Sequence, residues 1–120
     1  MIYNPSMENE KPDYLPEMPT DEELEEIIGF AKQGEVLAQR TLGYMYTSQD
    51  DFKNAHYWLG EAGKQNDYES IYALAVLYKI GHGVPKSLEA SYQLLIIAAK
   101  GGYPKAQQTL NEWEDAAFNN

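Results

Sequence analysis

GEVLAQRTLG (residues 34–43) recurs later in the chain as GYPKAQQTLN (residues 102–111). Two further pairs of segments match in the same way: LGYMY (42–46) with LAVLY (74–78), and DFKNAHYWLGEAGKQN (51–66) with SLEASYQLLIIAAKGG (87–102). The first pair is offset by 68 residues (34 to 102), the second by 32 (42 to 74) and the third by 36 (51 to 87). One unit therefore recurs about every 32–36 residues, a period typical of solenoid repeats.

The two copies differ in length only at one loop, which is TSQD (47–50) in the first copy and KIGHGVPK (79–86) in the second. Gly81 and Gly83 allow backbone angles that other residues avoid, and Pro85 and Ser87 are suited to starting the next helix. A phosphate-binding glycine loop needs a preceding strand, and no strand pattern precedes this one. We interpret the loop as a hinge between two packed helices.

The chain reads as a series of helices. Thr20 and Glu23 form a capping box, Asp51 and Ser87 are good N-caps, and Pro104 suits a first helical turn. The eight apolar positions 71–78 predict a helix that is covered on most sides. We expect six helices and no strand, within these segments: 20–34, 35–46, 51–66, 67–80, 87–102 and 103–118.

Small and large side chains alternate along these helices. Small residues allow two helices to approach closely, and large residues fill the remaining gaps. The small positions are Ala38, Gly43, Ala55, Ala62, Gly63, Ala75, Ala98 and Ala99, and the large ones are Leu42, Tyr46, Trp58, Leu74, Tyr78 and Leu94. The prediction is an all-α, short right-handed α-solenoid of helix–turn–helix repeats, with one domain at 20–118 and an extended, acidic, proline-rich arm at 1–19.

The residues of the repeat resemble a known pattern. It runs A-x-x-x-LG-x-x-Y, then a GxGV loop, then W-x-x-x-AA-x-x-G. The matching residues are Ala38, Leu42, Gly43, Tyr46, Ala55, Trp58, Ala62 and Gly63 in the first copy, and Leu74, Tyr78, Gly81, Gly83, Val84, Pro85, Leu94, Ala98, Ala99 and Gly102 in the second. Residues 34–113 thus resemble the Sel-one-like repeat family, which is related to the tetratricopeptide repeat. The first copy departs from the pattern by lacking the glycine loop.

Composition and charge limit the function classes. The chain has no cysteine, which excludes disulfides and thiolate chemistry. Of the net charge of −10, residues 1–35 carry −8, from ten acids and two lysines. Such an acidic region repels nucleic acid and anionic membranes and attracts a basic partner, although it can also be a solvated face that only keeps the chain soluble. With no signal-like start and no long apolar run, we expect a cytoplasmic protein that does not enter a membrane.

The sequence indicates no catalytic or metal site. His56 and His82 do not stand at a metal-ligand spacing with other histidines or acids. The acids at 22–26 fit the dipole of a helix start, and no serine has a nearby His–Asp arrangement. The expectation is a non-enzymatic protein with no cofactor.

The resemblance implies protein–protein interaction through the concave face, which the first helix of each repeat lines. Partner-binding positions carried over to that face are Arg40, Tyr44, Ile71, Tyr72, Val76 and Gln108. Tyrosine and arginine are frequent among energetically dominant interface residues. The competing interpretation is that Ile71, Tyr72 and Val76 pack against neighbouring helices.

Ile96 and Ile97 form a second candidate contact. The repeat pattern places charged residues there, so two isoleucines need a cover. The candidates are the N-terminal arm, the last helix, a second copy of this chain in a homodimer, or a foreign partner. The concave face, the acidic N-terminal region and this patch all stay open as contact surfaces.

The resemblance includes adaptors, assembly scaffolds and bacterial immunity proteins. Because the chain is short, acidic and without catalytic signals, the most specific expectation is an immunity protein that neutralises a cognate toxin effector with a basic domain. The alternative is an adaptor or regulatory scaffold that holds a peptide or helix of a signalling or secretion partner.

Overall fold

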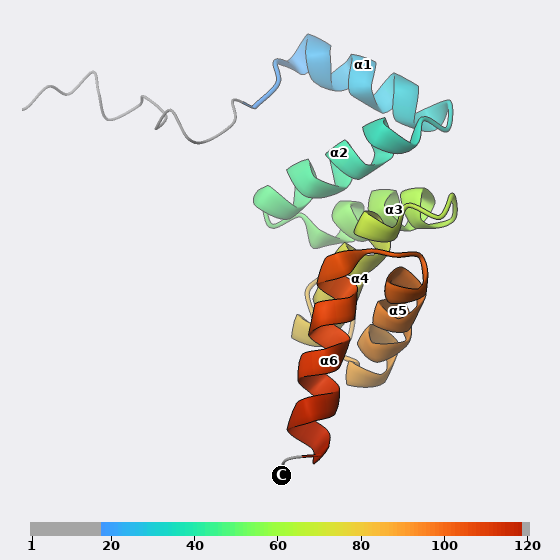
Figure 1. Ribbon diagram of the computed structural model, residues 1–120. Coiled ribbons are helices and arrows are strands. Elements are labelled where there is room, and N and C mark those ends of the chain that lie inside the picture. The colour runs from blue at the N-terminus through green and yellow to red at the C-terminus, as the bar shows by residue number, and fades with distance from the viewer. Residues whose placement is uncertain (1–17, 119–120) are drawn as a thin grey trace, which may run out of the picture.

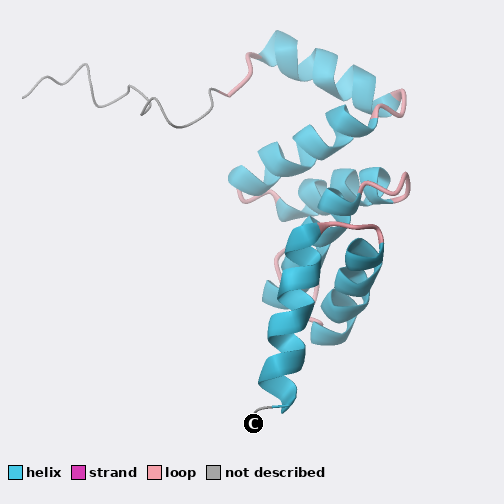
Figure 2. Cartoon of the chain, in the orientation of Figure 1, coloured by secondary structure: helices cyan, strands magenta, loops and turns pink. Residues whose placement is uncertain are grey.

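The computed structural model describes residues 18–118, and every regular element in that range is a helix (Figure 2). The helices are α1 (Asp21–Lys32), α2 (Val36–Ser48), α3 (Phe52–Gly63), α4 (Tyr68–Ile80), α5 (Leu88–Lys100) and α6 (Pro104–Phe118). The prediction of an all-α chain with six helices is confirmed. Residues 1–17 of the predicted arm lie outside the described residues, and Met18 and Pro19 have no regular structure.

Each helix packs against the next one in the chain, from α1 through to α6 (Figure 1). The pairs α2–α3 and α4–α5 are the two complete helical hairpins, while α1 and α6 lie at the two ends of the stack. This neighbour-to-neighbour arrangement is that of a short helical-repeat solenoid.

The helices begin and end at the residues that local chemistry favours. Thr20 and Glu23 form the predicted capping box, and the side chains of Asp51 and Ser87 accept from backbone N–H groups at the starts of α3 and α5. Asp67 caps α4 in the same way by accepting from the Ser70 N–H. Each such cap stabilises a helix by about 1 kcal/mol.

The expected close helix crossings are present. Gly43 of α2 is buried against α3, and a Cβ atom placed there would overlap the side chain of Leu59. At the α4–α5 contact, the hydroxyl of Ser91 donates to the carbonyl oxygen of Ala75 at 2.7 Å, and both residues are buried. A larger residue at Gly43 or Ala75 would force the helices apart.

The core is a series of small clusters along the stack. Ala31, Leu42 and Trp58 join α1, α2 and α3, and a middle cluster joins α3 to α4. The third cluster joins α4, α5 and α6, and its buried members are Ile71, Ala75, Leu95, Ala98 and Ala106. Helices α3 and α4 each belong to two of the three clusters and so link the two halves of the stack.

The glycine loop between α4 and α5 packs against the start of α3. Gly83 has a φ of +76°, and a Cβ atom there would lie 2.7 Å from the Cβ of Phe52 and 2.8 Å from its carbonyl carbon. The ring of the adjacent His82 lies 4.2 Å from the Phe52 ring. The loop is therefore a packed hinge, with no room for a side chain at Gly83.

Gly83→Ala should lower the free energy of unfolding by about 1–3 kcal/mol, because the alanine meets both a left-handed backbone and the Phe52 backbone. Gly102 is the matched control, since its φ is +92° and nothing lies within 4 Å of an added Cβ. Urea unfolding followed by circular dichroism measures both losses. An equal loss at the two glycines would mean that the loop does not pack on α3.

Candidate functional site

The first helices of successive repeats form one open groove. It has a volume of about 240 Å³, and the residues that line it come from α2, α4, the start of α6 and the residue before it, together with Leu59 of α3. We name it the tyrosine groove; its walls include Tyr44, Glu69, Tyr72, Val76, Tyr103 and Lys105. Three of the predicted site residues, Tyr44, Tyr72 and Val76, are thus brought together on one surface.

A charged network crosses this groove from α2 to α4. The guanidinium of Arg40 pairs with the carboxylate of Glu69 and lies 3.5 Å from a carboxylate oxygen of Asp67. The hydroxyl of Tyr44 donates to the other oxygen of Glu69 at 2.8 Å. Both Arg40 and Tyr44 are therefore held by Glu69, and one cation faces two carboxylates. The network fixes the orientation of Tyr44 at the groove wall.

The two tyrosine hydroxyls beside this network stay protonated to high pH. Burial raises the pKa of Tyr44 above its ordinary value, and the hydrogen bond to Glu69 and its charge raise it further. Burial also raises the pKa of Tyr103, with a further contribution from the charge of Glu69. Both groups therefore remain neutral hydroxyls, able to donate hydrogen bonds, across the physiological pH range.

The Tyr44 shift predicts a loss of stability in alkali. The folded chain holds the Tyr44 hydroxyl proton more tightly than the unfolded chain does. The contribution of this hydroxyl to the free energy of unfolding is therefore complete below a pH of about 10, where free tyrosine titrates, and it falls as the pH rises further. NMR of chains labelled at the tyrosine Cζ should show Tyr44 still protonated above the pH at which free tyrosine titrates. Titration of Tyr44 at the pH of free tyrosine would contradict the network.

The structure corrects one predicted site residue. Ile71 is 6% exposed and packs with Ala75, Leu95 and Ala98, so it belongs to the core and cannot contact a partner. The reason is that α5 and α6 cover the side of α4 that carries Ile71. Tyr72 is half-buried, with its ring 5.3 Å from that of Tyr103, and still borders the groove.

The remaining predicted residues lie away from the groove walls. Gln108 is exposed on α6, and its side-chain amide donates to Glu112 at 3.2 Å. Ile97 of α5 is 48% exposed and Ile96 is half-buried, and neither lines the groove. The isoleucine pair is thus a patch separate from the groove, and only Ile97 of the pair is exposed.

Sequence reasoning missed Glu69, Tyr103 and Lys105 as groove residues. Glu69 lies 29 positions from Arg40, close to but not at the repeat spacing, so no matched segment pairs the two. Gln39, adjacent to Arg40 in the sequence, is buried, and its side chain donates to the Ala31 carbonyl and accepts from the Gln65 amide. Its amide joins the ends of α1 and α3 to α2.

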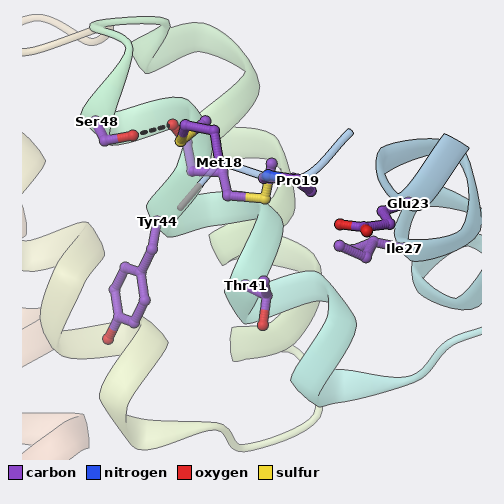
Figure 3. A pocket seen from close by; sticks show the side chains of 8 residues that line it. Met18, Pro19, Glu23, Ile27, Thr41, Tyr44 and Ser48 are labelled. Atoms are coloured by element: carbon purple, nitrogen blue, oxygen red, sulfur yellow. Dashed lines mark hydrogen bonds between the residues drawn. The ribbon is translucent and has the colours of Figure 1, made fainter. Parts of the chain in front are cut away.

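A larger cavity of about 430 Å³ lies between α1 and α2 (Figure 3). We call it the α1–α2 slot; its walls are Met18, Pro19, Glu23, Ile27, Thr41, Tyr44, Met45 and Ser48. Figure 3 shows Glu23 and Ile27 on α1 pointing across the slot toward Met18 and Thr41. Tyr44 borders both the slot and the tyrosine groove, so the two cavities adjoin.

The two histidines take structural positions. A ring nitrogen of His56 lies 3.1 Å from the hydroxyl of Tyr78, and His82 packs on Phe52. Within residues 18–118, no three His, Cys, Asp or Glu side chains are grouped so that they could hold a metal ion. In the same part of the chain, no helix has the length and apolar character needed to span a membrane.

Comparison with models of known protein families gives no match, and no solved structure matches the chain significantly. The repeat assignment therefore rests on the residues themselves, and the site on the groove and the slot described above.

Proposed function

We propose that this chain is a short Sel-one-like repeat protein that binds another protein through the tyrosine groove, without catalysing a reaction. The observation that carries the proposal is the groove itself, where Tyr44, Tyr72 and Tyr103 gather beside the Arg40–Glu69 pair. Tyrosine offers a large contact area at a small entropic cost, and tyrosine and arginine dominate many interface hot spots. The hydrogen bond and the ion pair to Glu69 fix the side chains of Tyr44 and Arg40 in position for a partner.

Charge supports a basic partner. The chain carries a net charge of −10, and five acids among positions 21–26 make the start of α1 an acidic surface, whereas at the groove Arg40 and Lys105 balance Asp67 and Glu69. Such a surface speeds the capture of a positively charged protein and suppresses acidic competitors. The specific form of the proposal is an immunity protein that occupies and neutralises a basic toxin domain in the same cell.

The proposal is tested with the product of the reading frame adjacent to the one that encodes this chain. Co-expression should yield a 1:1 complex and protect cells from that product. Tyr72→Ala should weaken the purified complex about thirtyfold, the loss expected at a hot spot. Tyr57→Ala is the matched control, because Tyr57 is an exposed tyrosine of α3 that lies outside the groove. Equal effects of the two substitutions, or no protection, would contradict the proposal.

The second candidate function is an adaptor that holds a peptide or helix. The observation that favours it is the shared wall at Tyr44, which places the slot and the groove next to each other. An adaptor of this kind should bind several partners at about micromolar affinity, and the binding should weaken as salt increases. A single partner bound far more tightly would favour the immunity function instead.

A further inference from the structure

The internal repeat indicates what the α1–α2 slot is for. At the offset of 32 residues, Thr41, Tyr44 and Met45 of α2 correspond to Ala73, Val76 and Leu77 of α4. Those three α4 residues line the tyrosine groove together with Tyr44 and Thr47 of α2. In the second repeat, therefore, the preceding first helix, α2, forms the other wall of the open groove, while Leu77 is buried in a cluster with Leu59 of α3.

In the first repeat the same face has no such helix within residues 18–118. Thr41, Tyr44 and Met45 instead border the 430 Å³ slot, opposite Glu23 and Ile27 of α1 (Figure 3). In the order of the stack, α1 precedes the first helix α2 and so takes the place of a second helix, with no first helix before it among the described elements. A helix in that place would form a further wall of the slot, as α2 does for the groove, so the apolar face of α2 lacks this neighbour.

The amino-acid sequence of residues 1–17 is poorly suited to supply this helix. Residues 1–17 contain Pro5, Pro12 and Pro16, and their longest proline-free stretch is the six residues 6–11. A helix of three turns needs about 11 residues, and proline inside it removes a hydrogen bond and clashes with the preceding turn. These residues also carry four acids against one lysine. They would be repelled by α1, which has five acids among positions 21–26.

We propose that the α1–α2 slot binds a basic amphipathic helix of a partner protein. Its apolar side would lie on Ile27, Tyr44 and Met45, and its basic residues would face Glu23 and the acidic start of α1. The unbranched side chains of Met18 and Met45 suit this role because they adapt to different apolar partners. The inference rests on the proposed function and deepens it by naming the segment that is bound.

The test uses the full chain and a synthetic helical peptide of about four turns, made of lysine and leucine with the leucines on one face. In ¹⁵N-labelled chain, the peptide should shift the amide resonances of Ile27, Thr41 and Met45. Met45→Lys should weaken its binding at least about tenfold, by removing apolar contact and adding a like charge. Leu37→Lys is the matched control on the same helix, since Leu37 is 62% exposed and lies outside the slot.

Three results would overturn the inference. Shifts confined to residues 21–26 would mean that the peptide is attracted by charge alone. In a second experiment, Tyr14 and Leu15 are both replaced by serine and no peptide is added. If the amide resonances of Thr41 and Met45 then shift, the slot belongs to the chain's own N-terminal residues. If sedimentation shows that the chain is a dimer and that Met45→Lys dissociates it, the slot binds a second copy of this chain.

The inference and the proposed function fail separately. If Tyr72→Ala abolishes the partner complex and Met45→Lys leaves it unchanged, the result supports binding at the groove and contradicts binding of a helix at the slot. Peptide binding at the slot, with no partner bound at the groove, would remove the groove function alone.

Discussion

Gly43→Val should lower the free energy of unfolding by about 3 kcal/mol. Any Cβ at this position overlaps the Leu59 side chain, and Leu59 is itself buried in the cluster that joins α3 to α4. Leu59 therefore cannot turn aside without disturbing Leu74 and Leu77. Valine adds two further carbons to the same contact, so α2 and α3 must move apart. Guanidinium unfolding followed by circular dichroism gives the magnitude.

Two other helical glycines provide the control. Gly29 of α1 and Gly60 of α3 have nothing within 4 Å of an added Cβ, so alanine there should stabilise the helix by about 0.5–1 kcal/mol. Gly43→Ala should destabilise, and the loss should be partly relieved when Leu59→Ala is added, because the two changes share one contact. A stabilising Gly43→Ala would show that α2 and α3 do not cross closely at this point.

Leu95→Ala should cost about 3–4 kcal/mol, the range for a buried leucine whose cavity cannot collapse. Leu95 packs with Ile71, Ala98 and Ala106, so its side chain joins α5 to both α4 and α6. Since domains of this size are stable by only about 5–15 kcal/mol, the variant should lose a large share of its stability.

The fluorescence of Trp113, which packs against the same cluster, measures this loss. Trp58 is replaced by phenylalanine in both the parent protein and the Leu95→Ala variant, so that Trp113 is the remaining tryptophan. Leu88→Ala is the control on the same helix: Leu88 is 55% exposed, so its truncation should change stability by no more than about 0.5 kcal/mol. A loss below about 1 kcal/mol in Leu95→Ala would contradict the assignment of Leu95 to the core.

The amino-acid sequence by itself determined the helices and their spacing. Thr20, Asp51 and Ser87 start helices through their own side chains, and the offset copies of one unit predict paired helices wherever they recur. The tight crossing at Gly43 also follows from local pattern, because a small residue opposite a large one recurs in both copies. These features depend on neighbours within one or two helical turns, or on the repeat, and both can be read along the chain.

Only the tertiary structure decided which apolar faces are covered. Ile71 and Tyr72 are adjacent in one apolar run, yet Ile71 is in the core and Tyr72 borders the groove. The pairing of Arg40 with Glu69 likewise depends on how α2 crosses α4. The slot at Met45 also depends on how α1 lies on α2, because residues of both helices form its walls. Helical periodicity sets which residues share a face, but the angle and partner of each crossing determine whether that face meets protein or solvent.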